Sequence, residues 1–149
     1  MSKLFPEYRS PWETEDQAAL RTHAAEFFRR EATPNQERWA ENHQIDRDFW
    51  TKAGSAGLLC LGLPDEFGGG GGNFGHEAVV QQELALAHDT AFGFNVHSTI
   101  VAHYISAYAT DEQKRRWIPK MSSGGMVIGV AMTEPGTGSD LQAVRTTAT

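Results

Sequence analysis

The stretch between residues 91 and 108 constrains the fold most, because it is apolar on nearly every side. Its apolar members leave little polar surface when they are placed on a helix: Phe92, Phe94, Val96, Ile100, Val101, Tyr104, Ile105 and Tyr108. A helix that is apolar all round is usually buried inside a protein. The stretch therefore predicts a helix at the centre of a packed helical core.

Two capping boxes mark helix starts on either side of this stretch. Thr14-Glu-Asp-Gln17 and Thr110-Asp-Glu-Gln113 each place a threonine three residues before a glutamine. In such a box the two side chains satisfy main-chain amides that have no partner inside the helix. We expect the first helix to end at Pro34 and the last to be broken near Pro119, because proline has no N–H to donate.

Further helices are expected between the two capping boxes. One covers residues 36–41 and carries Trp39 as a packing anchor, and the next begins after Asp46 and stops at Gly57. Another covers residues 75–88, with apolar side chains at helical spacing. About six helices result, so the predicted fold class is mainly α.

A different pattern begins at Met126. The run Met126–Met132 is apolar, contains valine and isoleucine, and is bounded by glycine and proline, which predicts a buried β-strand. Residues 141–149 alternate weakly and indicate a second strand at most. Because a strand needs a neighbour for its main-chain N–H and C=O groups, the sheet to which Met126–Met132 belongs is expected to be incomplete.

The loop after this strand carries four polar side chains on a turn that glycine and proline constrain: Thr133, Glu134, Ser139 and Asp140. A rigid strand end that presents amides and hydroxyls is typical of a cofactor site. Ordinary capping of the turn is the alternative use of the same side chains.

Three motifs in order carry a family resemblance. Residues 131–141, Ala-Met-Thr-Glu-Pro-Gly-Thr-Gly-Ser-Asp-Leu, resemble the flavin-contacting motif of the acyl-CoA dehydrogenases. Residues 61–69 resemble the Pro-acidic-acidic-aromatic-Gly-Gly loop of that family, and residues 110–121 resemble its Glu-Gln-Lys segment. Residues 97–101 and 140–142 resemble the long-chain branch. The resemblance implies an N-terminal α-helical domain at residues 1–124 and the incomplete start of a middle β-domain at residues 125–149.

The resemblance implies FAD as the cofactor and α,β-dehydrogenation of an acyl-CoA thioester as the reaction. In that reaction a carboxylate removes the α-proton while flavin N5 accepts the β-hydride. Met132 and Thr133 are expected to contact the isoalloxazine ring, and Val130 to lie beside the flavin and the acyl tail. Ser139 is expected at the mouth of the site, on the CoA side, where it binds cofactor and substrate.

No residue of this chain matches the family's catalytic glutamate, which lies in the C-terminal domain, so no catalytic base is assigned. Glu134 is expected to be a structural part of the flavin motif. The chain alone is therefore expected to be inactive. Val96 and Ile100 share one face of the apolar helix, and we expect both to reach the acyl tail.

The resemblance also implies partners for the whole enzyme: acyl-CoA as substrate, electron-transfer flavoprotein as acceptor, and three further copies in a homotetramer. Two other functions stay open at this point. One is a stand-alone, non-catalytic helical module that binds acyl-CoA or a partner dehydrogenase subunit. The other is a different oxidoreductase on the same scaffold, such as a nitroalkane-oxidase-like or flavin-dependent monooxygenase enzyme.

Charge and composition exclude several classes. The net charge of -6 and the lack of a basic stripe beyond residues 114–116 argue against a nucleic-acid partner. No run is long enough for a membrane span, and no targeting segment is evident at the N-terminus, so we expect a cytoplasmic protein. Cys60 is the single cysteine and is predicted to be a small buried apolar residue. The histidines have no zinc-ligand spacing.

The five consecutive glycines at residues 68–72 fit neither common nucleotide-binding motif. No Gly-Lys-Ser/Thr follows them, and they do not form a Gly-x-Gly-x-x-Gly turn between a strand and a helix. They are predicted to be a flexible connection between helices, and the resemblance places them near the family's substrate entrance.

Overall fold

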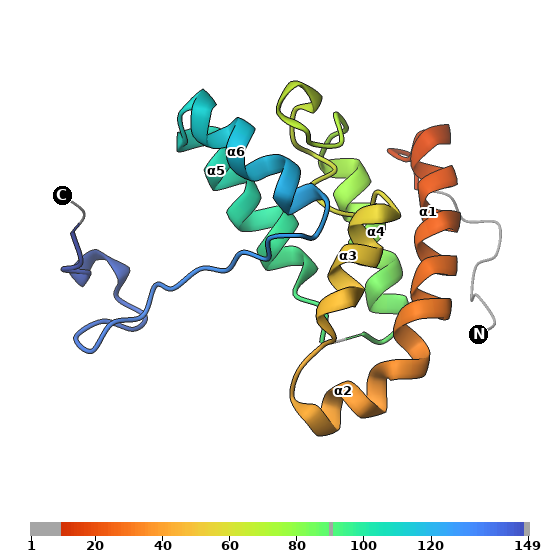
Figure 1. Ribbon diagram of the computed structural model, residues 1–149, viewed down its shortest axis with the longest axis horizontal. Coiled ribbons are helices and arrows are strands. Elements are labelled where there is room, and N and C mark those ends of the chain that lie inside the picture. The colour runs from red at the N-terminus through yellow and green to blue at the C-terminus, as the bar shows by residue number, and fades with distance from the viewer. Residues whose placement is uncertain (1–9, 90, 148–149) are drawn as a thin grey trace.

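The structure is a computed structural model that describes residues 10–89 and 91–147. Its α-helices, shown in Figure 1, are α1 (Glu15–Phe27), α2 (Gln36–Asn42), α3 (Arg47–Ser55), α4 (Phe74–Leu86), α5 (Ala102–Tyr108) and α6 (Asp111–Ser122). The mainly α fold class is confirmed. Both predicted capping boxes are present, and the Gln17 and Gln113 side chains accept from Thr14 N at 3.1 Å and Thr110 N at 2.9 Å. Within the described residues, no helix is both long and apolar enough to cross a membrane.

The chain stays helical through both prolines that were expected to stop it, so these two predictions are wrong. After α1 comes a π-helical turn (Phe28–Ala32), and Pro34 lies at the start of the short 3-10 helix Thr33–Asn35 that follows. The first residues of a helix have no partner for their N–H groups, so proline costs nothing there. Pro119 lies inside α6, where Ile118 and Met121 on either side of it are fully buried and hold the helix together.

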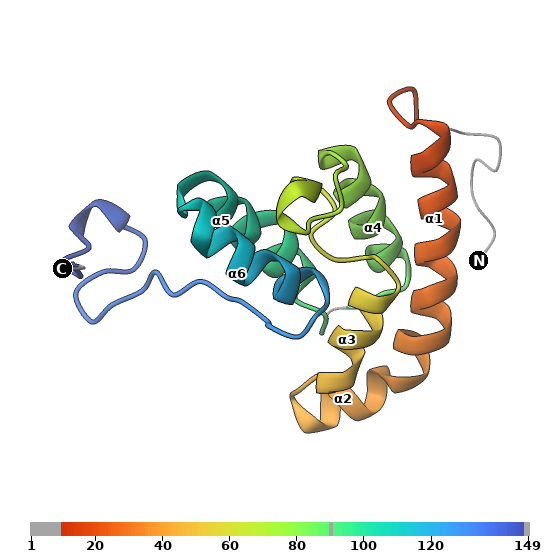
Figure 2. The same cartoon turned by 45° about the horizontal axis from the view of Figure 1, so that its top comes forward.

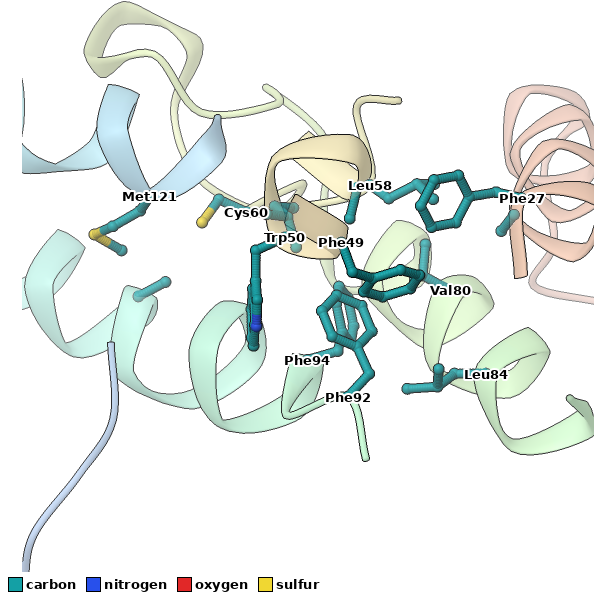
Figure 3. Packing of buried hydrophobic residues seen from close by; sticks show 14 of the residues in the cluster. Phe27, Phe49, Trp50, Leu58, Cys60, Val80, Leu84, Phe92, Phe94 and Met121 are labelled. Carbon is teal, nitrogen blue, oxygen red and sulfur yellow. The ribbon is translucent and has the colours of Figure 1, made fainter. Parts of the chain in front are cut away.

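Aromatic side chains from separate helices form the centre of the core. Phe49 of α3 meets Trp39 of α2 and Phe92 edge-on, with ring centroids 5.0 and 4.9 Å apart. Figure 3 shows Phe27, Val80 and Leu84 closing the same cluster from α1 and α4. Burying a large apolar side chain contributes roughly 1.5–3 kcal/mol. This cluster therefore fixes how α1 to α4 pack, and Trp39 is confirmed as a packing anchor.

The stretch 91–108 divides into the π-helix η4 (Asn95–Val101) and α5, and only part of its surface is buried. Phe92 and Phe94 lie in the core, whereas Ile100 is 42% exposed, Tyr104 61% and Tyr108 82%. The prediction of a helix buried on nearly every side is therefore wrong for one face. The π-helical turn is wider than an α-helix and changes which residues share a face. Ile100 near its end and Tyr104 and Tyr108 of α5 are the exposed residues.

The glycine loop is folded back on the chain that precedes it. Main-chain N–H groups of residues 69–72 donate to the carbonyls of residues 60–64, over distances of 2.8–3.1 Å. A Cβ on Gly69 would stand 2.5 Å from the Leu63 carbonyl oxygen. The prediction of a flexible connection is wrong, because glycine allows two backbone segments to lie in direct contact.

Met126 and Ile128 still pack against the helices, and beyond Ile128 the chain runs away from them, as Figures 1 and 2 both show. Neither Met126–Met132 nor residues 141–147 form a strand, and the last stretch begins with the 3-10 turn Leu141–Ala143. The only β-bridge in the described residues joins Glu134 and Thr137. The two strand predictions are not met because the described chain contains no neighbouring strand for either segment.

Candidate functional site

Close backbone contacts fix the point at which the candidate flavin segment, residues 126–140, leaves the helices. A Cβ on Gly54 of α3 would stand 2.2 Å from the Ser123 carbonyl carbon, and one on Gly124 would stand 2.0 Å from the Trp50 carbonyl oxygen. Gly124 also has a φ of +70°, which favours glycine. The end of α6 is therefore pressed directly against α3.

Arg47 holds the same corner through main-chain carbonyls. Its two terminal nitrogens donate to the carbonyl oxygens of Gly124 and Gly125, each at 2.7 Å. Met126 N in turn donates to Lys120 O at 2.9 Å. A planar guanidinium that donates to two acceptors sets their orientation as well as their distance. The direction of the chain at residue 126 is thus set by α3 and α6 together.

His97 of η4 makes the last hydrogen bond between the helices and the flavin segment. Its ring is fully buried, and Nδ1 accepts from Ile128 N at 3.2 Å while Nε2 donates to Met121 O at 3.2 Å. Burial lowers the pKa of His97 below its ordinary value. Cys60 lies beside this ring and is fully buried, which confirms the prediction for it, and burial raises the pKa of its thiol to about 12.

The predicted cofactor residues lie on the exposed part of the segment, beyond the bond to His97. Val130 is 48% exposed and Met132 55%, and Thr133 and Ser139 are exposed as well. Within the described chain, the main-chain groups of residues 129–133 make no hydrogen bonds. The segment therefore presents free N–H and C=O groups next to apolar side chains.

Glu134 is bound by its own loop. Its carboxylate accepts from Arg145 N at 2.6 Å, from Thr146 N at 3.1 Å and from the Thr146 hydroxyl. These bonds, the Thr146 hydroxyl first, lower the pKa of Glu134 below its ordinary value. A carboxylate used in this way orders the loop between residues 134 and 146.

The two predicted acyl-tail residues are placed differently. Ile100 lines an open hollow of about 370 Å³, together with Thr99, His103, Tyr104 and Tyr108. Val96 is half-buried and is not among the lining residues. Both belong to η4, the helix that carries His97, so one helix holds the candidate substrate residues and the bond to the candidate flavin segment.

Sequence reasoning missed Arg47 and treated His97 as an ordinary core or surface histidine. It also missed Glu77, a fully buried carboxylate of α4 that accepts from Gly62 N at 3.0 Å and pairs with His103 Nε2 at 2.9 Å. The sequence offered a signal for His97 alone, which stands among apolar residues of an expected helix. A buried imidazole needs hydrogen-bond partners for both of its nitrogens.

The family of this chain follows from comparison with known proteins. The N-terminal domain of the acyl-CoA dehydrogenases matches residues 14–125. The chain therefore belongs to the acyl-CoA dehydrogenase family. The long-chain specific acyl-CoA dehydrogenase, mitochondrial, of Rattus norvegicus is 43% identical over 129 residues, which cover 87% of this chain and 30% of the relative. The chain thus spans about a third of the length of the relatives it matches.

Solved structures agree in fold. An acyl-CoA dehydrogenase from Geobacillus kaustophilus superimposes with a TM-score of 0.85 at 34% identity, over 91% of this chain and 36% of that one. A glutaryl-CoA dehydrogenase from Mycobacterium smegmatis, solved in complex with FADH2, reaches a TM-score of 0.80 at 24% identity, over 89% of this chain and 34% of that one. The second likeness concerns the fold alone.

Proposed function

We propose that this chain is the N-terminal part of an FAD-dependent acyl-CoA dehydrogenase, which removes hydrogen across the α,β bond of an acyl-CoA thioester. One observation carries the proposal: the flavin segment, residues 126–140, begins at a corner held by the close contacts of Gly124 and the hydrogen bonds of Arg47 and His97, and it then offers free main-chain groups at residues 129–133. A rigid support followed by unpaired polar groups suits a bound cofactor.

The residues present fit a flavin. Its ring system has an apolar face and a polar edge, which call for apolar contact and for main-chain hydrogen bonds side by side. Val130 and Met132 offer the first, and the free groups of residues 129–133 with the Thr133 hydroxyl offer the second. FAD, when bound, supplies the acceptor for the hydride that leaves the β-carbon. The M. smegmatis relative of the same fold was solved with FADH2.

The remaining loop residues have supporting roles in this proposal. Ser139 is exposed and faces the CoA side, where it binds cofactor and substrate. Glu134 is engaged by Arg145 and Thr146 and serves the loop. The catalytic base is the glutamate that the family carries in its C-terminal domain, which lies outside this chain. The chain alone is inactive for that reason. Ile100 and Val96 contact the acyl tail, and the open hollow beside Ile100 supports the first of these assignments.

The wider organisation belongs to the same proposal. Residues 1–124 form the helical domain and residues 125–149 begin the β-domain, which is supported by the family match that ends at residue 125. The complete enzyme passes electrons to electron-transfer flavoprotein and assembles as a homotetramer. The cytoplasmic location stays a prediction, and the name of the rat relative assigns that protein to mitochondria.

The test uses the gene product as its host makes it, purified with an antibody to this segment. We expect a flavoprotein whose flavin absorbance bleaches when an acyl-CoA thioester is added without oxygen.

A Thr133→Val variant, which keeps the shape of the side chain and loses the hydroxyl, is expected to release FAD more readily, whereas the matched variant Thr147→Val is not. A flavin-free species of 16.4 kDa that binds acyl-CoA would overturn the proposal in favour of a binding module. Bleaching by a nitroalkane alone would favour the other oxidoreductase class.

A further inference from the structure

The hydrogen bonds of His97 determine where its proton lies. A main-chain N–H can only donate, so Nδ1, 3.2 Å from Ile128 N, must be the unprotonated acceptor. A carbonyl can only accept, so Nε2, 3.2 Å from Met121 O, must carry the hydrogen. The two bonds therefore require one neutral tautomer of the ring. A charged imidazole has no lone pair to offer to Ile128.

Packing holds this ring in place. The Trp50 ring meets it edge-on, with centroids 5.0 Å apart, and Cys60 Sγ lies 3.9 Å from Nε2. The ring is fully buried among these neighbours. The side chain consequently has little freedom to turn away, and Nδ1 is an acceptor with a fixed position.

The bond to Ile128 is the outermost tie between the helical body and the flavin segment. Arg47 and Lys120 hold residues 124–126, two residues earlier, and beyond Ile128 no hydrogen bond in the described chain leads back to a helix. In extended chain each residue advances about 3.3 Å, so Met132 and Thr133 lie on the order of 13–17 Å further along. A small change of direction at Ile128 is therefore multiplied at the residues that face the flavin.

We propose that His97 is a positioning residue: its Nδ1 directs the chain at Ile128 and thereby sets where Met132 and Thr133 stand. This inference rests on the proposed function, because it takes residues 130–139 as the flavin-contacting stretch. It assigns to η4 a second role beside lining the hollow. A histidine that only filled space would make no demand on which ring nitrogen carries the proton.

Two substitutions separate the two bonds. In His97→Asn the amide oxygen can stand in for Nδ1 and accept from Ile128 N, while the bond to Met121 is lost. In His97→Gln the amide nitrogen can stand in for Nε2 and donate to Met121 O, while the bond to Ile128 is lost. Both replace the ring with a smaller amide and create similar vacant space, so each is the matched control of the other.

The first readout is amide hydrogen exchange of the 149-residue chain, followed by NMR. We expect the Ile128 amide to exchange about tenfold faster in His97→Gln than in His97→Asn, as the loss of one hydrogen bond predicts. Arg47→Met, which removes the two bonds to residues 124 and 125, is expected to leave the Ile128 bond in place. Equal exchange at Ile128 in the two His97 variants would overturn the proposal.

A second readout needs no substitution and applies even where both variants fail to fold. In the wild-type chain, a scalar coupling across the hydrogen bond should connect Ile128 N with His97 Nδ1, and the hydrogen should be found on Nε2. A proton on Nδ1 would overturn the proposal directly.

Flavin binding separates this inference from the proposed function. In the gene product as its host makes it, we expect His97→Gln to hold FAD at least about tenfold more weakly than His97→Asn, in line with the lost hydrogen bond. Equal affinities in the two variants would overturn the positioning role. A wild-type protein that binds no FAD would overturn the proposed function, and the exchange contrast at Ile128 would still decide whether His97 directs the segment.

Discussion

The helical body, residues 10–125, and the segment that follows it satisfy the needs of the backbone in opposite ways. A helix pairs its N–H and C=O groups internally, so α1 to α6 need only bury an apolar face. The segment is also apolar, yet it exposes large side chains along its length: Val127, Val130, Met132, Leu141 and Val144. Met126 and Ile128, next to the helices, are partly buried against the core, but the extended chain beyond them has no neighbouring strand within the described residues to pair with its N–H and C=O groups. Similar apolar content therefore produces a core in one region and an open surface in the other.

The largest expected effect compares the same kind of truncation in the two regions. Phe49→Ala removes a ring that is 2% exposed and lies at the centre of the aromatic cluster, and it should lower the free energy of unfolding by about 3–5 kcal/mol. Val130→Ala, in the segment, should change it by less than about 0.5 kcal/mol. Urea unfolding followed by circular dichroism measures both. A comparable loss in the two variants would show that the segment is part of the cooperative body.

A smaller effect is expected at the corner where the two regions meet. Gly124→Ala would place a Cβ 2.0 Å from the Trp50 carbonyl oxygen at a φ of +70°, and it should cost about 2–4 kcal/mol from strain and overpacking. Gly129 has no atom within 4 Å of a Cβ placed on it and is the matched control. Gly129→Ala should leave the unfolding midpoint in urea unchanged. If Gly124→Ala also left the unfolding midpoint in urea unchanged, α3 and the end of α6 would not be in close contact.

The comparison also explains how far the sequence predicted the fold. The helix starts at Thr14 and Thr110 were found because each threonine acts with a glutamine three residues away. Helix ends were wrongly expected at Pro34 and Pro119. Pro34 lies at the start of a 3-10 helix, where its missing N–H has no cost, and burial of Ile118 and Met121 holds α6 together around Pro119. The glycine loop was misjudged for a similar reason. Its amides pair with the carbonyls of residues 60–64, and no local rule specifies that pairing.

The candidate site also contains residues that the sequence could predict and residues that it could not. Local motif residues such as Met132, Thr133 and Ser139 could be identified from the sequence, because they are contiguous. The residues that support them could not. Arg47 lies 77 positions before Gly124, and His97 lies 31 positions before Ile128. Only the packing of α3, η4 and α6 brings these groups to one corner.

A pH-dependent effect is expected at His97, because protonating its buried ring would destabilise the helical body and would also break the hydrogen bond from Ile128 N. Burial lowers the pKa of His97 in the folded chain. Near pH 6.5 the His97 ring therefore binds a proton in the unfolded chain and stays neutral in the folded chain. The contribution of neutral His97 to the free energy of unfolding is therefore fully present above about pH 6.5. It falls as the pH drops toward the pKa of His97 in the folded chain, with a slope of at most about 1.4 kcal/mol per pH unit. Unfolding in urea at several pH values measures this slope.

The control for this prediction is His97→Asn, which cannot titrate and should flatten the slope relative to wild type. The pKa values of Asp16 and Asp46 are about 2, because Thr14 with His76 and Arg38 with Trp39 hold the respective carboxylates in the charged form. These two carboxylates therefore take up protons only well below pH 6.5, where the loss of stability from His97 begins. Identical slopes in the variant and the wild type would contradict the assignment.

The smallest expected effect is confined to the segment. Glu134→Gln removes the charge that accepts from Arg145 N, Thr146 N and the Thr146 hydroxyl, so the amides of residues 145 and 146 should exchange faster while the unfolding free energy of the body stays unchanged. In the wild type these bonds lower the pKa of Glu134 below 4.5. The protection of the amides of residues 145 and 146 is therefore complete above about pH 4.5 and is lost as the pH falls through the pKa of Glu134 in the folded chain. Glu41→Gln, on the exposed end of α2, is the matched control and should alter neither quantity. Protection of Arg145 and Thr146 that persisted in Glu134→Gln would show that the loop is ordered by something other than this carboxylate, and a loss of stability in the body would show that the two regions are coupled after all.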